Sequence, residues 1–296
     1  MTPAFFDLSA RVKLRVKGSD CFRYLNGQIT NDLRKATPAL AMQASILSAK
    51  GKLNAHLFVT VEADGVFLLD ADAEQRETLG ARLDRYIIAD DVEIEDVTDR
   101  FSILHFLGAE IPQGVAIVRT IAAKRFGERG QDLWIERSDL PQVRQQLSIH
   151  AEALDETSTE LFRIEMGVPR WGAELTDEII PVEADLEDDA IDYAKGCYIG
   201  QEVISRMKMS GQTNKRLRGL VSVADAPLQP GMGLYHDQSG KDAGWITSAT
   251  RSARLGKEIA LGYVRRGFNG EGSQLCARLE SHGNLVPVTV VPLPFA

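Results

Sequence analysis

Cysteine is scarce in this chain of 296 residues. The three cysteines, Cys21, Cys197 and Cys276, lie far apart and form no C-x-x-C pair. Neither a disulfide framework nor a zinc or iron–sulfur site with local ligand spacing is therefore indicated. The five histidines are scattered as well, and we expect no metal site. An odd cysteine count without a disulfide pattern is typical of a reducing compartment, so we expect a cytoplasmic protein.

The sequence also lacks long hydrophobic runs and an excess of positive charge. No run approaches the roughly 20 apolar residues that cross a bilayer. The first residues do not show the basic segment and apolar core of an export signal. A net charge of -8 argues against a protein devoted to binding nucleic acid. We therefore expect neither a membrane nor a nucleic acid as partner.

Common catalytic and nucleotide-binding motifs are absent too. The chain contains no G-x-G-x-x-G or Walker A sequence. No nucleophile elbow or defined pair of acids supports a hydrolase. What is present is enough apolar material for real cores, at 44% hydrophobic residues. Because the chain exceeds the size at which one core usually stops growing, we expect two or three compact units.

The hydrophobic pattern over the first two thirds of the chain mixes short strands with helices. Strands are predicted at 45–47, 57–61, 66–69, 92–96, 101–107, 115–118 and 133–136. Helices are predicted after Asp20, after Asp72, over 140–147 and over 159–166. Strands follow strands too often for a doubly wound parallel sheet, so the pattern indicates an α+β fold.

From Asn214 onward, strand signals dominate. Strands are predicted at 217–223, 244–250, 258–264, 274–279 and 285–291, with glycine or proline turns between them. This pattern is typical of a small antiparallel barrel. We place the main boundary near residues 211–214, which gives domains 1–213 and 214–296.

The chemically densest stretch is Lys-Gly-Cys-Tyr-Ile-Gly-Gln-Glu at residues 195–202, here called the signature octet. An acidic run precedes it, and a basic stretch from Arg206 to Arg218 follows. A thiol acts as nucleophile or metal ligand only as thiolate, and Lys195 is a candidate to lower the pKa of Cys197. The neighbouring acids oppose that effect, and a buried inert cysteine is the alternative.

The octet, followed by Arg206, resembles the signature K-G-C-[YF]-x-G-Q-E with its downstream arginine. This signature marks the YgfZ-type branch of the glycine cleavage T-protein (GcvT, aminomethyltransferase-like) family, a branch tied to iron–sulfur cluster maintenance. Nearly the whole chain takes part in the resemblance. Supporting motifs are T-N-D at 30–32, R-x-E-x-G at 163–167, P-x-E-A at 181–184, and the strands at 244–248 and 259–264.

The resemblance implies a three-lobed GcvT-like fold. Two intertwined mixed α/β subdomains would form the N-terminal region, and an antiparallel β-barrel would form domain 214–296. It also implies tetrahydrofolate, or a one-carbon-substituted reduced folate, as the ligand of a central cavity.

The implied folate site uses a different partner for each part of the ligand. Glu183 matches the donor edge of the pterin in a two-point hydrogen bond, and Arg216 and Arg206 match the carboxylates of the glutamate tail. Trp171 and Tyr198 are candidates to stack on the rings. The family motifs add Glu165 and Asn31. For each of these residues, a solvated charge or a packing role is the alternative.

One departure from the family concerns a catalytic aspartate. T-proteins that transfer an aminomethyl group carry it in a G-G-x-x-D-D stretch, which would align here with residues 51–56. This chain has Ala55 and His56 there. The resemblance therefore implies a folate-binding protein without aminomethyltransferase activity, in which Cys197 is essential. Such a protein supports assembly or repair of iron–sulfur enzymes and has client or assembly proteins as partners.

Two other hypotheses stay open at this point. The protein is then either a folate-dependent transferase that moves a methyl or aminomethyl group, or an interaction module with a vestigial cavity. In the second case, Cys197 only packs. Whether the protein is an enzyme is left undecided, and an aminomethyltransferase-like transferase is the enzyme class that we would expect.

Overall fold

The chain folds into two compact units. The computed structural model describes residues 2–62, 65–108, 110–236, 239–279 and 285–295. The first unit comprises Met1–Glu156 and Glu187–Val203, and the second comprises Thr157–Leu186 and Ile204–Ala296. The signature octet therefore belongs to the first unit, whereas Glu183 and the basic stretch that follows the octet belong to the second.

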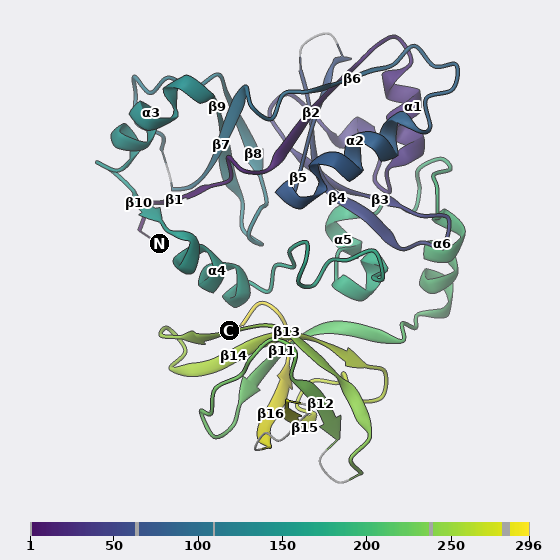
Figure 1. Ribbon diagram of the computed structural model, residues 1–296, viewed down its shortest axis with the longest axis vertical. Helices are drawn as coiled ribbons and strands as arrows, with labels where there is room; N and C mark the ends of the chain where they lie inside the picture. The colour runs from purple at the N-terminus through teal and green to yellow at the C-terminus, as the bar shows by residue number, and fades with distance from the viewer. Residues whose placement is uncertain (1, 63–64, 109, 237–238, 280–284, 296) are drawn as a thin grey trace. The chain divides into compact units, whose positions relative to one another are not determined.

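Two five-stranded sheets form the framework of the first unit (Figure 1). Sheet I has the order β3-β4-β5-β2-β6, with β2 at Val12–Lys17, β3 at Met42–Leu47, β4 at Leu53–Val61, β5 at Phe67–Ala71 and β6 at Glu93–Asp96. Sheet II has the order β10-β1-β7-β9-β8, with β1 at Ala4–Asp7, β7 at Phe101–Leu107, β8 at Arg119–Ala123, β9 at Gly130–Glu136 and β10 at Glu152–Leu154. Neighbouring strands are antiparallel except for β1 and β10, which are parallel. The chain starts in sheet II, builds sheet I and then returns to sheet II.

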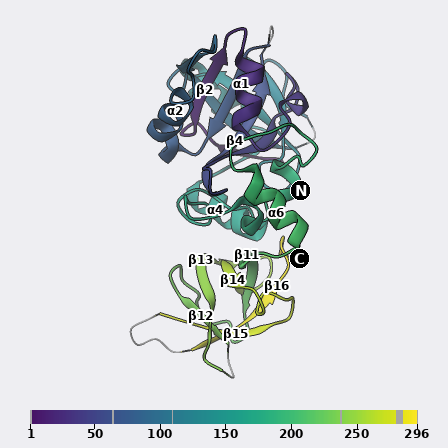
Figure 2. The same ribbon diagram turned by 90° about the vertical axis from the view of Figure 1, so that its right-hand side faces the viewer.

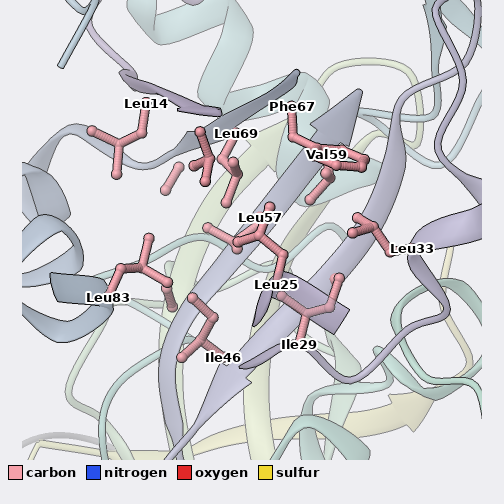
Figure 3. Packing of buried hydrophobic residues seen from close by; sticks show 14 of the residues in the cluster. Leu14, Leu25, Ile29, Leu33, Ile46, Leu57, Val59, Phe67, Leu69 and Leu83 are labelled. Carbon is pink, nitrogen blue, oxygen red and sulfur yellow. The ribbon is translucent and has the colours of Figure 1, made fainter. Parts of the chain in front are cut away.

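Helices cover one face of each sheet. Helices α1 (Cys21–Gln28) and α2 (Arg76–Asp84) pack on sheet I, and α3 (Leu140–Leu147) packs on sheet II. Apolar side chains at helical spacing make this packing possible, as with Leu79 and Leu83 of α2. Figure 3 shows the resulting core of sheet I, where Leu25 and Leu83 lie around Leu57 of β4. Short helical turns η1 (Leu33–Lys35), η3 (Ala73–Gln75), η4 (Arg137–Asp139) and α5 (Glu187–Ala190) complete the first unit.

Strand β5 is buried on both faces, which explains its almost continuous apolar sequence. Phe67 and Leu69 point into the core beneath α1 and α2. Leu68 lies on the opposite face and packs with Ile103 and Trp134 of sheet II. The alternation of side chains along one strand thus joins the two sheets.

A buried ion cluster also lies between the two sheets. The Arg125 guanidinium donates to both carboxylate oxygens of Asp70, at 2.7 and 2.8 Å, and to Asp132 at 2.6 Å. Asp70 belongs to sheet I and Asp132 to sheet II. Burial alone would raise the pKa of Asp132, but Arg125 and His105 lower it to about 2. One guanidinium therefore bridges two buried carboxylates, one from each sheet, while Arg11 pairs with Asp70 and His105 with Asp132.

A closed six-stranded barrel dominates the second unit (Figure 2). Its strands follow the order β11-β14-β13-β12-β15-β16, and all pairs are antiparallel. Their bounds are Lys215–Ser222 for β11, Gly233–His236 for β12, Asp242–Ser252 for β13, Lys257–Arg265 for β14, Gln274–Arg278 for β15 and Val286–Val291 for β16. Helix α4 (Glu156–Glu165) and the turn η5 (Pro181–Ala184) precede the barrel in sequence, and α6 (Gln201–Ser210) crosses the boundary between the units.

The predicted fold class is confirmed, because the structure combines mixed α/β sheets with a closed antiparallel barrel. The prediction of a strand at 115–118 is wrong, since that segment follows a turn at Gly114 and the strand begins at Arg119. The pattern also failed to indicate β1, β2, β10, β12 and α6. The domain boundary near residues 211–214 stays a prediction, next to a barrel that begins at Lys215.

Within the described residues, no helix is both long enough and apolar enough to cross a membrane.

Candidate functional site

The signature octet packs against a tight turn of the first unit. Gly200 has a φ of +86°, and a Cβ added there would lie 2.7 Å from the backbone oxygen of Ser48. Gly51 has a φ of +74°, and a Cβ added there would lie 2.8 Å from the Cβ of Val203. Such close approaches, at positive φ, are open only to glycine. The octet is therefore held against the turn at 48–51, which precedes the stretch aligned with the catalytic aspartate of the family.

Lys195 anchors the start of the octet to α1. Its Nζ donates to the backbone oxygens of Asn26 at 2.5 Å and Ile29 at 2.7 Å. These carbonyls lie at the C-terminal end of α1, where backbone acceptors lack helical partners and a positive charge is favourable. Burial lowers the pKa of Lys195 to about 8, although Asp32 and Asp192 oppose the shift. The catalytic role predicted for Lys195 stays a prediction, while its contacts are those of a structural anchor.

Asn31 joins the octet's surroundings through a complete set of hydrogen bonds. Its Nδ2 donates to the backbone oxygens of Gln43 at 2.9 Å and Asp189 at 3.1 Å. Its Oδ1 accepts from the backbone nitrogen of Asp32 at 2.9 Å and from Nζ of Lys35 at 3.0 Å. A side-chain amide has two donors and two acceptor positions, so this one is saturated. A direct contact between Asn31 and a ligand would require one of these bonds to break.

Cys197 and Tyr198 are neighbours in sequence but differ in exposure. Cys197 is exposed, whereas Cys21 and Cys276 are buried. Tyr198 is 7% exposed, and burial raises the pKa of its hydroxyl to about 12. The octet thus presents its thiol to solvent while its phenol packs inside, as expected for a loop that displays Cys197.

Glu183 occupies the turn η5 of the second unit and is 3% exposed. Its Oε2 accepts from the backbone nitrogen of Ile180 at 3.2 Å and from Nζ of Lys215 at 2.8 Å. Among the described residues, its Oε1 accepts no hydrogen bond. The carboxylate is therefore oriented by one oxygen and has acceptor capacity left on the other. Lys215 was not among the predicted site residues, and only its place in the basic stretch pointed to it.

Arg216 forms a second ion pair between the start of β11 and the segment that carries Glu183. Its Nε donates to Asp185 Oδ1 at 2.5 Å, and Arg218 donates to the other oxygen of Asp185 at 3.2 Å. Because β11 begins at Lys215, successive basic side chains of this strand meet the two acids of the segment 183–185. Two ion pairs thus join the segment 183–185 to the start of β11, and each contains one residue predicted to hold the ligand, Glu183 or Arg216.

The other predicted residues of the second unit are placed less directly. Glu165 ends α4 and accepts hydrogen bonds from Ser252 Oγ and from Arg254 Nε, the latter at 3.2 Å, so it ties the helix to the barrel. Arg206 is exposed on α6, and Trp171 is half-buried in a loop. A ligand contact by any of these three stays a prediction.

Ala55 and His56 lie in β4 and are both buried. His56 Nδ1 lies 3.5 Å from Ser45 Oγ, and its Nε2 lies 3.2 Å from Gln43 Oε1. Burial lowers the pKa of His56 to about 4, so the imidazole is neutral at pH 7. This position therefore offers no carboxylate and no charge for chemistry on an amine.

The buried His56 should make stability depend on pH. Its pKa is about 4 in the folded chain and about 6.5 when unfolded, so between these values only the unfolded chain takes up the proton. The contribution of His56 to the free energy of unfolding is fully present above pH 6.5. It should fall by up to about 3 kcal/mol as the pH drops to 4. We expect His56→Gln to lose this part of the pH dependence, as measured by urea unfolding at pH 7 and 4.5. The exposed His150→Gln should keep the wild-type difference, and an unchanged difference in His56→Gln would contradict the prediction.

The described part of the chain holds no evident metal site. There, no three side chains of His, Cys, Asp or Glu come close enough to hold a metal ion.

The barrel of the second unit is similar to a known domain family. Residues 215–296 match the family of the glycine cleavage T-protein C-terminal barrel domain. This part of the chain is therefore similar to the T-protein barrel. Lys215 and Arg216, which pair with Glu183 and Asp185, are the first residues of that T-protein barrel.

The similarity extends beyond the T-protein barrel. Over 98% of its length, the chain is 24% identical to the aminomethyltransferase of Bacillus subtilis (strain 168) and 25% identical to that of Geobacillus kaustophilus (strain HTA426), covering 86% of each. Its fold matches that of glycine cleavage system aminomethyltransferase T from Bartonella henselae, with a TM-score of 0.87 at 18% identity over 100% of this chain and 86% of that chain. These comparisons support a glycine cleavage T-protein-like family for the chain and confirm the GcvT-like fold.

Proposed function

We propose that this protein is a cytoplasmic member of the YgfZ-type branch that binds tetrahydrofolate, or a one-carbon-substituted reduced folate. It supports assembly or repair of iron–sulfur enzymes and transfers no aminomethyl group. Relatives named as aminomethyltransferases support a reduced folate as the ligand. The observation that carries the proposal is the Glu183 carboxylate, which Lys215 orients and whose Oε1 accepts no hydrogen bond from the residues that the structure describes. Asp185, two residues further on, pairs with Arg216.

These residues fit the chemistry of a reduced folate. The pterin edge resembles a guanidine, and a carboxylate meets such a donor pair with short, charge-assisted hydrogen bonds. Lys215 Nζ donates to Glu183 Oε2 at 2.8 Å and so orients the carboxylate. Arg216 is 36% exposed at its side chain and bonds Asp185 through Nε, so its terminal amino groups are suited to a carboxylate of the glutamate tail. Tyr198 and Asn31 are packed or saturated, which leaves Glu183 and Arg216 as the principal contacts.

Strand β4 carries Ala55 and His56 where a transferase of the family has its catalytic aspartate, which supports a loss of aminomethyl transfer. The Ala55 side chain has no polar group, and the neutral, buried His56 is hydrogen-bonded to Ser45 and Gln43 of the neighbouring strand β3. Neither side chain replaces an aspartate that handles an amine. That the octet and Glu183 line one central cavity stays a prediction. The folate contacts described above do not include Cys197.

Isothermal titration with tetrahydrofolate tests the ligand. We expect Glu183→Gln to weaken binding at least tenfold, since a charge-assisted hydrogen bond contributes about 1.5–3 kcal/mol. Asp177→Asn serves as the control, because Asp177 is an exposed acid of the same unit. Absence of heat from the wild-type protein would refute folate binding and leave the interaction module. Equal affinity of Glu183→Gln and wild type would remove Glu183 from the site.

Cys197 is tested in cells that lack the protein. An exposed thiol can form mixed disulfides with, or ligate metal of, an iron–sulfur partner, and alanine can do neither. We expect Cys197→Ala to fold and to bind tetrahydrofolate like the wild type, yet to restore none of the lost iron–sulfur enzyme activity. Cys21→Ala, which removes a buried thiol, is the matched control and should restore it. Full rescue by Cys197→Ala would show that the thiol is not functional.

A second candidate function is favoured by the names of the relatives. If the protein is a folate-dependent aminomethyltransferase, it should turn over when tetrahydrofolate and an aminomethyl donor are supplied, despite Ala55 and His56. Turnover by the wild-type protein in such an assay would support this function and overturn the proposal that transfer has been lost.

A further inference from the structure

The first unit contains a pocket of about 130 Å³ where its two sheets meet. Its floor is made by Leu68 of β5, Phe101 of β7 and Trp134 of β9, which belong to one buried cluster. No residue of this pocket belongs to the signature octet or to the proposed folate contacts. Its chemistry can therefore be considered independently of the proposed function.

The floor is apolar, aromatic and already packed. Leu68, Phe101 and Trp134 are 1%, 7% and 2% exposed. The two rings meet edge to face, with their centroids 5.9 Å apart and their planes at 65°. A cavity of about 150 Å³ lined by aliphatic and aromatic side chains binds benzene. A pocket of this size therefore accommodates one six-membered ring and excludes larger ligands such as nucleotides.

The walls carry an excess of positive charge. Three arginines, Arg15, Arg100 and Arg119, line the pocket together with one acid, Glu62. Arg15 holds Glu62 Oε2 through Nε at 2.9 Å and Nη2 at 2.8 Å, while Arg119 Nη2 lies 3.4 Å from Glu62 Oε1. Arg119 Nη1 also donates to the backbone oxygen of Val61 at 3.4 Å. Because both contacts of Arg119 are longer than those between Arg15 and Glu62, its guanidinium is the more weakly held of the two. The lining residues thus include three arginines and one acid, while Arg15 also lies 3.8 Å from Glu95 outside the lining.

Arg100 adds a further constraint at the mouth of the pocket. Its guanidinium lies 4.7 Å from the centroid of the Phe101 ring and pairs with Glu136 at 3.2 Å. A planar cation above an aromatic floor favours a ligand that is itself flat and carries negative charge at its edge.

We propose that this pocket binds a small aromatic carboxylate. The six-membered ring occupies the apolar floor on Phe101 and Trp134, and the carboxylate accepts hydrogen bonds from the arginines, with Arg119 as the principal donor. Each half is needed, because a neutral ring lacks a partner for the guanidinium groups and a small carboxylate without a ring leaves the floor empty.

Benzoate is the probe for this site, and Trp134 is the reporter. Trp134 belongs to the first unit, whereas Trp171 and Trp245 belong to the second. In the double variant Trp171→Phe, Trp245→Phe, the tryptophan fluorescence therefore comes from Trp134 alone. We expect benzoate to change this fluorescence saturably and to bind at least tenfold more tightly than benzamide or acetate. No saturable change with benzoate, or equal binding of benzoate and benzamide, would overturn the proposal.

Variants then test the arginine. Arg119→Gln should weaken benzoate binding at least tenfold, and Arg119→Lys should weaken it less, because lysine keeps the charge but loses the planar fork. Arg129→Gln, an exposed arginine between β8 and β9, should bind like the wild type. Equal losses in Arg119→Gln and Arg129→Gln would overturn the assignment. If Arg119→Gln fails to fold in thermal unfolding, the comparison of Arg119→Lys with Arg129→Lys decides in the same way.

Discussion

Replacing Arg125 by methionine should lower the free energy of unfolding of the first unit by about 3–5 kcal/mol. Arg125 is 6% exposed and forms hydrogen bonds with Asp70 and Asp132, which are 2% and 0% exposed. Methionine fills a similar volume but leaves these two carboxylates facing each other in a medium that penalises charge. Asp70 keeps Arg11 and Asp132 keeps His105, so the expected loss is that of one missing partner.

Urea unfolding followed by Trp134 fluorescence, in the background with Trp171 and Trp245 replaced by phenylalanine, measures this loss. Arg125→Lys should lose less than Arg125→Met, since it retains the charge. The exposed Arg129→Met should change stability by no more than about 0.5 kcal/mol. Adding Asp70→Asn and Asp132→Asn to Arg125→Met should recover part of the loss, because the unpaired charges are then gone. A loss in Arg125→Met no larger than in Arg129→Met would show that the ion cluster does not hold the two sheets together.

Gly200→Ala should destabilise the first unit by about 2–4 kcal/mol and displace the octet. The added Cβ would lie 2.7 Å from the backbone oxygen of Ser48 and 3.1 Å from the Cβ of Leu47. Backbone cannot move aside as a flexible side chain can, and the φ of +86° adds the cost of a left-handed conformation. Because Cys197 precedes this contact by three residues, the environment of its thiol should change as well.

The matched control lies in the same octet. A Cβ at Gly196 meets no atom within 4 Å, and Gly196 is not among the glycines at positive φ. Gly196→Ala should therefore leave stability within about 1 kcal/mol of the wild type. Urea unfolding gives the free energy of unfolding. The rate at which iodoacetamide alkylates Cys197 reports the environment of its thiol. Equal behaviour of the two alanine variants in both measurements would refute a close approach between the octet and the turn at 48–51.

The sequence predicted the fold class well because its signals are local. Glycine and proline turns separate the strands of the barrel, and apolar spacing marks α3, whose predicted range agrees with the structure. Strand β1 was missed because it has only four residues, and its sequence A-F-F-D does not alternate. Strand β2 was missed although its sequence V-K-L-R-V-K alternates strictly. Helix α6 was missed because its polar sequence shows little apolar periodicity, and its basic residues were interpreted as a ligand-binding stretch.

For the candidate site, the sequence by itself determined the residue types and their order. The octet, the P-x-E-A segment and the basic start of β11 are all evident in one dimension, as is the missing aspartate at residues 55 and 56. Only the tertiary structure decided which groups are already occupied. Lys195 caps α1, and the amide of Asn31 is saturated. Glu183 pairs with Lys215 through one oxygen, and no described residue donates to the other. These partners lie between 12 and 169 positions away in the chain, except for short-range contacts of Asn31. No local pattern encodes such distances, because they arise only when sheets, helices and barrel are packed.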